Sequence, residues 1–212
     1  MRITIVYDNM AIGTELISDW GWSCLIETGE RNILFDTGGN GRILMANLNT
    51  LNIKPESVSD VFISHPDFDH IGGLSAFLNS NKKAVVHVPS SFRGIRYPNR
   101  VNYCAEPDEL YPAVFTTGEL GEREQSLALK TEKGLVLIIG CGHPGVENIM
   151  NTISQFGNVY GVIGGFHGFD KYDALENTDI ICPAHCTKYK EQITLLYADK
   201  CIEGGVGRVI KV

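Results

Sequence analysis

Histidines that follow apolar stretches are the feature that most constrains how this chain can fold. Four of its six histidines lie just past the C-terminal end of a short apolar run of the kind that forms a buried strand. They are His65 after residues 61–63, His143 after 135–139, His167 after 159–163 and His185 after 179–182. Packing alone gives histidines no reason to prefer strand ends, so we expect these side chains to meet in one cleft at a sheet edge. A helical pattern over 147–156 predicts alternating strands and helices in this half of the chain.

The densest group of polar side chains follows the first of these runs. Four side chains that can bind metal fall within six positions, namely His65, Asp67, Asp69 and His70. Imidazole nitrogens and carboxylate oxygens suit zinc, iron or manganese. The alternative is a polar turn between a strand and a helix, which aspartate and proline would also serve. We favour a metal site.

Further strands and helices are predicted in the first half of the chain. The strands cover residues 3–7, 22–27, 32–36 and 84–88, and the helices cover 40–52 and 74–78. The strand over 32–36 ends at Asp36-Thr37-Gly38, which is either a plain turn or the position of a carboxylate that orients a metal ligand. His87 lies inside a strand, and we expect a core residue without a chemical role.

Residues 89–113 are the least regular part, because they contain four prolines. They also carry the basic cluster Arg93, Arg96 and Arg100. We favour a solvated loop, and the alternative is a lid whose guanidinium groups hold an anionic substrate.

Composition excludes several classes of protein. The formal net charge of −7 argues against nucleic acid or an anionic membrane as a partner. No apolar run reaches the roughly 20 residues of a membrane span, and Met1-Arg2 leads straight into a strand pattern rather than a signal peptide. Six cysteines are too few for a disulfide framework in 212 residues, so we predict a reduced, cytoplasmic protein. Without a repeat or a clean linker, residues 1–212 are predicted to form one domain, and the oligomeric state is left open.

Several motifs together resemble a known family. The run from His65 to His70 resembles the His-x-His-x-Asp-His signature of the metallo-β-lactamase superfamily, with Asp67 in place of the second histidine. The turn at Asp36 resembles its early Asp-Thr-Gly turn. Motifs at 140–145, 164–167 and 183–187 are similar to a subgroup of relatives of dihydropterin–ribofuranosylaminobenzene phosphate synthase. The resemblance implies a four-layer αββα sandwich (α/β, or α+β, class), with two mixed sheets, outer helices and a metal site at one edge.

The resemblance also implies two divalent metal ions, which are either zinc or one of the harder ions iron and manganese. The implied ligands are His65, Asp67 and His143 for one ion, and Asp69, His70 and His185 for the other. The bridging aspartate of the superfamily has no clear counterpart, and Cys141 and His167 are the candidates for its place. Cys141, like Cys182 and Cys186, is otherwise a small buried residue beside the site.

Two departures from the family pattern affect the site. Asp67 puts an oxygen where relatives have a nitrogen, which shifts the preference from zinc toward iron or manganese. Lys188 stands where relatives tend to have glycine, so contacts with substrate there are expected to differ. Together with Arg93 and Arg96, Lys188 is a candidate substrate-binding residue.

The resemblance favours a hydrolase acting on a small, possibly anionic ester, lactone or phosphoester. A metal-bound water would attack the substrate, Asp69 would orient or deprotonate that water, and His167 would protonate the leaving group. A pterin-type synthase that performs a condensation is the first alternative. Iron-dependent chemistry on oxygen or sulfur species, or metal binding without turnover, are the others, because fold alone does not fix the reaction.

Overall fold

The computed structural model describes the backbone of residues 1–212 and every side chain except that of Glu122. The chain divides into two compact units. Unit 1 comprises residues 1–103 and 204–212, and unit 2 comprises residues 104–203. The single domain over residues 1–212 stays a prediction.

Unit 1 is built on a seven-stranded mixed sheet in the order β13-β1-β2-β3-β4-β5-β6. The strands are β1 (Arg2–Tyr7), β2 (Ser23–Glu27), β3 (Asn32–Phe35), β4 (Asp60–Phe62), β5 (Val85–Pro89), β6 (Val101–Cys104) and β13 (Val209–Lys211). The pairs from β13 to β3 are antiparallel, whereas β3, β4 and β5 run parallel. The parallel strands therefore end at the same sheet edge, which places the residues that follow them close together.

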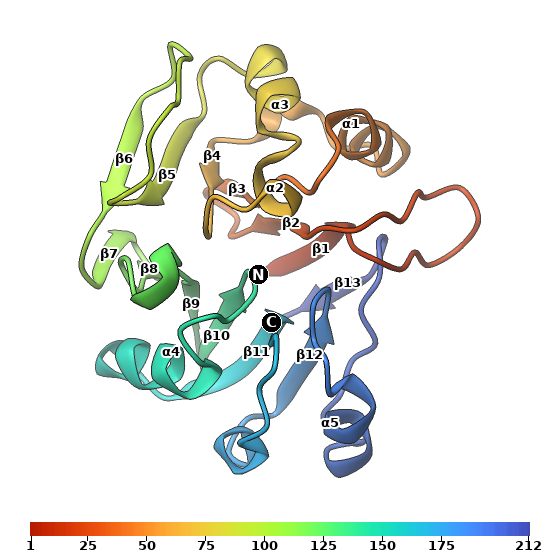
Figure 1. Cartoon of the computed structure of the whole chain (residues 1–212), viewed down its shortest axis with the longest axis vertical. Helices are drawn as coiled ribbons and strands as arrows, with labels where there is room; N and C mark the ends of the chain where they lie inside the picture. The colour runs from red at the N-terminus through yellow and green to blue at the C-terminus, as the bar shows by residue number, and fades with distance from the viewer. The chain divides into compact units, whose positions relative to one another are not determined.

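Helices cover this sheet and bury its apolar side chains. They are α1 (Gly41–Thr50), α2 (Phe68–Ile71) and α3 (Leu74–Ser80), with a 3₁₀ turn η1 (Pro55–Ser57). Leu44 and Leu48 of α1 stand four residues apart on one helical face, and they share a core with Leu34 and Val61 of the sheet. Figure 1 shows α1 and α3 beside the strands β1 to β5. The Asn40 side chain caps α1 by accepting from the backbone N–H of Arg42.

Unit 2 is built on a six-stranded mixed sheet in the order β12-β11-β10-β9-β8-β7. The strands are β7 (Asp108–Tyr111), β8 (Val114–Thr116), β9 (Leu127–Thr131), β10 (Gly134–Ile139), β11 (Val159–Gly165) and β12 (Ile180–Ala184). The helices are α4 (Val146–Ile153) and α5 (Lys190–Leu196), with 3₁₀ turns η2 (Gly121–Arg123), η3 (Ser154–Phe156) and η4 (Tyr172–Leu175). Strands β10, β11 and β12 are parallel, and the others pair antiparallel.

The core of unit 2 follows from two periodicities. Leu135, Leu137 and Ile139 alternate along β10 and point to one face of the sheet. Val146 and Ile149 of α4 lie three residues apart on one face of that helix and belong to the same apolar cluster. In Figure 1, α4 lies beside β10 and α5 beside β12.

The predicted strands before each of the four histidines are confirmed, as are the helical stretches over 40–52, 74–78 and 147–156. The prediction of an irregular loop over 89–113 is wrong in its second half, which contains β6 and β7. Its prolines at 98, 107 and 112 flank these two strands without interrupting them, and edge positions of this kind tolerate proline. Among the described residues, we find no helix that is both long and apolar enough to span a bilayer. The cytoplasmic location stays a prediction.

Candidate metal centre

In unit 1, the candidate site begins where the parallel strands β3 and β4 end. The backbone N–H of Asp36, directly after β3, donates to the carbonyl of Phe62 at the end of β4 (2.8 Å). The next residue, Thr37, donates to the carbonyl of His70 from both its backbone N–H and its hydroxyl (2.8 Å each). The turn after β3 is thereby fastened to α2, the short helix that carries the second histidine.

Asp36 is a completely buried carboxylate that organises this turn. Its Oδ1 accepts from the backbone N–H of Ser64 (2.7 Å). Its Oδ2 accepts from the Ser64 hydroxyl (2.7 Å) and contacts Nδ1 of His70 (2.7 Å). Asp36 also has φ 53°, a left-handed conformation that is costly for a residue with a Cβ. Of the two interpretations of this turn, the structure favours the carboxylate that orients a histidine.

When the two rings are neutral, these contacts determine which nitrogen of each histidine carries the proton. Nδ1 of His70 donates to the acceptor-only carboxylate of Asp36, so Nε2 of His70 carries the lone pair. The single hydroxyl hydrogen of Ser64 is engaged with Asp36. The contact between Ser64 Oγ and Nδ1 of His65 (2.8 Å) therefore has the histidine as donor. His65 Nε2 then carries a lone pair as well, which is the tautomer that binds metal.

Two carboxylates stand beside these lone pairs. Oδ2 of Asp67 lies 3.5 Å from Nε2 of His65, and Oδ2 of Asp69 lies 3.8 Å from Nε2 of His70. Two ligand atoms about 2.1 Å from one ion, at a tetrahedral angle, are about 3.4 Å apart. Both pairs therefore have a spacing that one metal ion can bridge, and the two rings lie only 4.1 Å apart between centroids. The structure brings together all four residues predicted in this stretch.

Gly72 and Gly73 allow this arrangement, because the backbone of the Thr37–Gly39 turn packs directly against them. The N–H of Gly73 donates to the carbonyl of Gly38 (3.2 Å). A Cβ at Gly72 would overlap the carbonyl oxygen of Gly39, and a Cβ at Gly73 would overlap that of Thr37.

Replacing Gly72 by alanine is therefore expected to destabilise the fold by about 1–3 kcal/mol, the usual range for overpacking, and to weaken metal binding. Thermal denaturation and metal analysis would measure the two effects. Gly121→Ala is the matched control, because nothing lies within 4 Å of a Cβ at that position. Equal behaviour of the two variants would contradict this account of the turn.

In unit 2, a buried glutamate plays the part that Asp36 plays in unit 1. Oε1 of Glu124 accepts from the backbone N–H groups of Cys141 (3.0 Å) and Gly142 (2.8 Å). Its Oε2 accepts from the backbone N–H of His143 (3.0 Å) and lies 2.9 Å from Nδ1 of the same residue. His143 Nδ1 donates to this carboxylate, so Nε2 of His143 carries the lone pair.

Nothing in the sequence singles out Glu124. A lone glutamate in a loop is most often a solvated surface residue, and its partners come 17 to 19 residues later in the chain. A weak signal is available in hindsight. The glycine-rich turn after β10 exposes several backbone N–H groups in a row, and such a turn requires an acceptor.

His167 and His185 both occupy strained backbone conformations at strand ends. Their φ angles are 40° and 47°, in the left-handed region that residues with a Cβ rarely adopt. The rings of His143 and His167 lie 4.9 Å apart between centroids. His185 forms a group with Cys141 and Cys186 in which one ligand atom from each residue lies within 4.8 Å of the others. Strain of this kind concentrates at functional sites.

The two cysteines of that group are in direct contact, with 3.2 Å between their Sγ atoms. Hydrogen bonding with Cys141 lowers the pKa of the Cys186 thiol to about 6, although burial acts in the opposite direction. The charge of His185 and hydrogen bonds with His167 lower this pKa further. A thiolate is therefore favoured at position 186 at neutral pH.

An open cleft of about 460 Å³ adjoins these histidines in unit 2. Its lining includes His143, His167, Phe169 and the glycine turn before α4. An ion pair between Lys171 and Glu147 stands in its wall. The hydrogen bond from Lys171 lowers the pKa of Glu147, so this carboxylate stays ionised over the physiological range.

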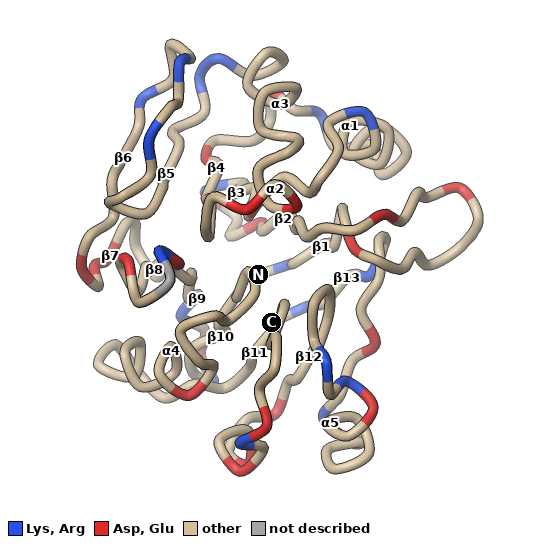
Figure 2. The backbone as a smooth tube through the Cα atoms, viewed as in Figure 1, with Lys and Arg blue, Asp and Glu red and all other residues tan. Residues whose placement is uncertain are grey.

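Two of the candidate substrate-binding residues, Arg93 and Lys188, have partners within the protein. Arg93 donates from Nη1 to the carbonyls of Ser90 (2.8 Å) and Phe92 (2.7 Å), and Figure 2 shows basic segments along the chain between β5 and β6. The backbone N–H of Lys188 donates to the carbonyl of His167 (2.8 Å), and its ammonium lies over the ring of Tyr189. Contacts of Arg93, Arg96 and Lys188 with substrate stay a prediction.

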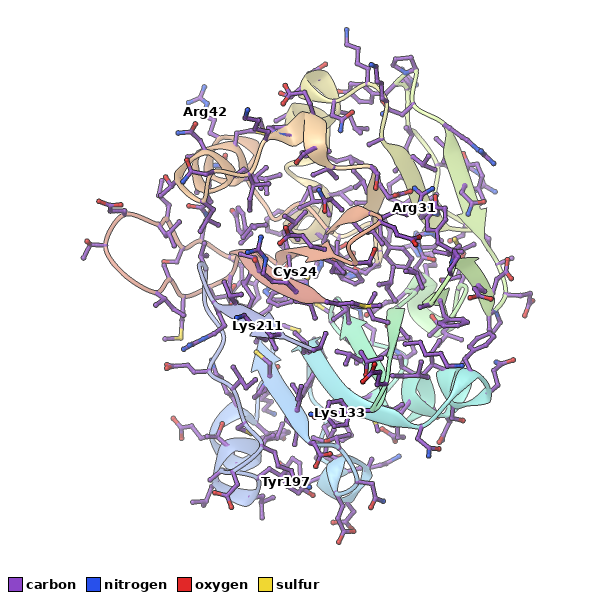
Figure 3. All side chains as sticks on the ribbon, turned by 180° about the vertical axis from the view of Figure 1, so that it is seen from behind. Cys24, Arg31, Arg42, Lys133, Tyr197 and Lys211 are labelled. Atoms are coloured by element: carbon purple, nitrogen blue, oxygen red, sulfur yellow. The ribbon has the colours of Figure 1, made fainter. Side chains whose placement is uncertain are left out.

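His87 lies apart from the candidate ligands, as predicted for a core residue. Its Nε2 is 3.0 Å from Oδ1 of the buried Asp60, and its Nδ1 is 3.2 Å from the amide of Asn102. Asp60 is also bound by Arg31 (2.8 Å), which Figure 3 labels. This pair provides a buried aspartate–histidine contact for comparison with Asp36 and His70.

Comparison with known proteins now identifies the family. The model of the metallo-beta-lactamase superfamily matches residues 21–146, and the chain belongs to that superfamily. The predicted fold class is confirmed, because the chain shares its fold with solved structures of this superfamily. Tm1679, described as a metal-dependent hydrolase of the beta-lactamase superfamily, aligns over 100% of this chain and 99% of its own with a TM-score of 0.83 and 25% identity.

The predicted subgroup resemblance is also confirmed. A synthase from Methanocaldococcus jannaschii, named 7,8-dihydropterin-6-methyl-4-(beta-D-ribofuranosyl)-aminobenzene-5'-phosphate synthase, is 26% identical over 94% of this chain and 95% of its own length. Zn²⁺-bound PqqB from Methylobacterium extorquens has the same fold, with a TM-score of 0.65, 11% identity and full coverage of both chains.

Proposed function

We propose that this protein is a metal-dependent hydrolase that acts on a small ester, lactone or phosphoester. One observation carries the proposal. In His65, His70 and His143, Nδ1 is held by a polar partner of the chain, which leaves the lone pair on Nε2 of each ring. Three imidazoles whose Nδ1 atoms are held in this way are typical of metal ligands.

The proposed ligands follow the order that the superfamily signature gives. His65, Asp67 and His143 are assigned to one ion, and Asp69, His70 and His185 to the other. These donors are nitrogen and oxygen atoms, which fit zinc, iron or manganese, and the carboxylate of Asp67 favours the harder ions.

The residues of the chain have separate tasks in the proposed reaction. When bound by these residues, a divalent ion would supply a water with its pKa lowered to about 7 and would polarise the bond under attack. Asp69, whose side chain is 11% exposed, is suited to accept a proton from the attacking water. His167 lines the cleft and is the candidate donor of a proton to the leaving group. The cleft volume of about 460 Å³ suits a small molecule.

A synthase is the second candidate, and the similarity to the archaeal enzyme favours it. The same metal ligands could serve a condensation, because the ligands do not specify the substrate. Two assays separate the candidates. One follows release of p-nitrophenol from phosphate and acetate esters, and the other follows formation of the joined pterin and ribofuranosyl-aminobenzene phosphate product. Turnover in only one assay selects that candidate, and metal binding without turnover in either would contradict both.

Replacing His65 by alanine is expected to remove at least one equivalent of metal per chain and to leave the fold largely intact. His65 lies on a loop at a strand end, whereas the core is built from the strands. Elemental analysis of protein purified without added metal measures this loss. His87→Gln is the control, since its pairing with Asp60 involves no proposed ligand. Unchanged metal content in the His65 variant would contradict the assignment.

A further inference from the structure

We propose that Cys141 and Cys186 are a site of reversible oxidation, at which hydroperoxides convert the two thiols into a disulfide. The two Sγ atoms lie 3.2 Å apart. A disulfide bond is about 2.05 Å long, so a movement of about 1.2 Å brings the sulfur atoms to bonding distance. Neither residue takes part in a disulfide in this structure.

The fold of unit 2 holds this pair together. Cys141 follows β10 and Cys186 follows β12, and both strands pair in parallel with β11 between them. Their carboxyl ends therefore meet at one sheet edge, although the two residues are 45 positions apart in the chain. Gly165, at the end of β11, also packs closely against this pair, because a Cβ there would lie only 2.8 Å from Sγ of Cys186. Sequence alone gives no sign of the pairing.

The reaction balances with a hydroperoxide as the oxidant. The Cys186 sulfur attacks the peroxide O–O bond and becomes a sulfenic acid, and one water leaves when the peroxide is H₂O₂. The Cys141 sulfur then displaces the hydroxyl group as a second water and forms the S–S bond. Two electrons pass from the two sulfur atoms to the peroxide, and both thiol protons end in the water. A dithiol then reduces this disulfide by thiol–disulfide exchange, which restores both thiols and leaves the dithiol oxidised to its own disulfide.

The position of the pair gives this oxidation a consequence for the metal. Cys141 is two residues before His143, and Cys186 directly follows His185. Closing the bond pulls on both loops and displaces these two histidines, so the disulfide form is expected to bind metal more weakly. This consequence rests on the proposed metal site, whereas formation of the bond does not.

The test uses metal-free, full-length protein treated with increasing H₂O₂, blocked with an alkylating agent and digested with trypsin. Cleavage after Lys133, Lys171 and Lys188 places the two cysteines in peptides 134–171 and 172–188. We expect these peptides to be joined, with a mass about 2 Da below the sum of the reduced pair, and to separate on treatment with dithiothreitol. Absence of the joined species, with overoxidised cysteines in its place, would overturn the proposal.

Peptide 172–188 also contains Cys182, so matched variants are needed. Cys182→Ser and Cys201→Ser should keep the joined species. Cys186→Ser and Cys186→Ala should both lose it while remaining folded by circular dichroism. Persistence of the joined species in either variant of Cys186 would also overturn the proposal.

A second measurement tests the consequence for the metal. Metal-loaded wild-type protein should release metal on oxidation and recover it after reduction, and Cys186→Ala should release none. Full retention of metal by the disulfide form would contradict the coupling. Because the bond itself is measured without metal, that result is distinguishable from failure of the proposed function.

Discussion

Replacing Glu124 by glutamine is expected to lower metal affinity by about 10- to 100-fold, the usual effect of losing a partner of a metal ligand. Glutamine keeps one carbonyl oxygen, which can still accept from the backbone N–H groups of Cys141 and Gly142. Its amide nitrogen then faces Nδ1 of His143, where a carboxylate oxygen now lies 2.9 Å away, and also the backbone N–H of His143, which loses its acceptor. An amide donor there makes Nδ1 the acceptor and moves the proton to Nε2, which can then no longer bind a metal.

Competition with a chromophoric chelator would measure the affinity, and long-range ¹⁵N–¹H spectra of the metal-free protein would report the tautomer of His143. The control is Glu132→Gln, an exposed glutamate in the turn between β9 and β10. Glu124→Ala is expected to be far more damaging, by about 3–5 kcal/mol, because it leaves buried donors without their acceptor. Wild-type affinity in the Gln variant would remove Glu124 from the site.

Replacing Asp36 by asparagine is expected to have a still larger effect, a loss of about 100-fold or more in metal affinity. Oδ2 of Asp36 contacts both His70 Nδ1 and the hydroxyl of Ser64. An amide nitrogen there would donate to both atoms. The hydroxyl would then turn its hydrogen toward His65, so that both histidines take the tautomer that binds metal poorly. The opposite amide orientation would set its nitrogen against the N–H of Ser64, where Oδ1 now accepts (2.7 Å).

Asp60→Asn separates this effect from a general loss of stability. Asp60 is also completely buried and also contacts a histidine, His87, which is not a proposed ligand. We expect both variants to melt at a lower temperature than the wild type and only Asp36→Asn to lose metal. A matching loss in both variants would mean that metal content merely follows stability.

The local motif was the part of the site that the sequence predicted best. His65, Asp67, Asp69 and His70 lie within six positions, so one turn and one short helix bring them together whatever the rest of the chain does. Asp36 could be named as a candidate because it ends a strand, although its contact with His70 spans 34 residues. In both cases the signal was local, namely a cluster within six positions for the motif and a strand end for Asp36.

Glu124, Ser64 and the cysteine pair could not be predicted, because their roles depend on tertiary contacts. Glu124 acts on backbone groups, which carry no residue-specific signal. Ser64 matters only through the direction of one hydroxyl hydrogen. The strands β6 and β7 were missed for a different reason, since their flanking prolines were interpreted as signs of a loop.

Because the chain itself holds the rings of His65, His70 and His143, folding and metal binding can occur in a defined order. The buried carboxylates that hold these rings are satisfied by serine, histidine and backbone donors, so the ion is not needed to hold the rings in place. The polypeptide can therefore fold first and acquire its metal afterwards, unlike small zinc domains that are unfolded without it. Binding then requires little rearrangement, and the occupant of the site is set by which suitable ion is available rather than by the folding reaction.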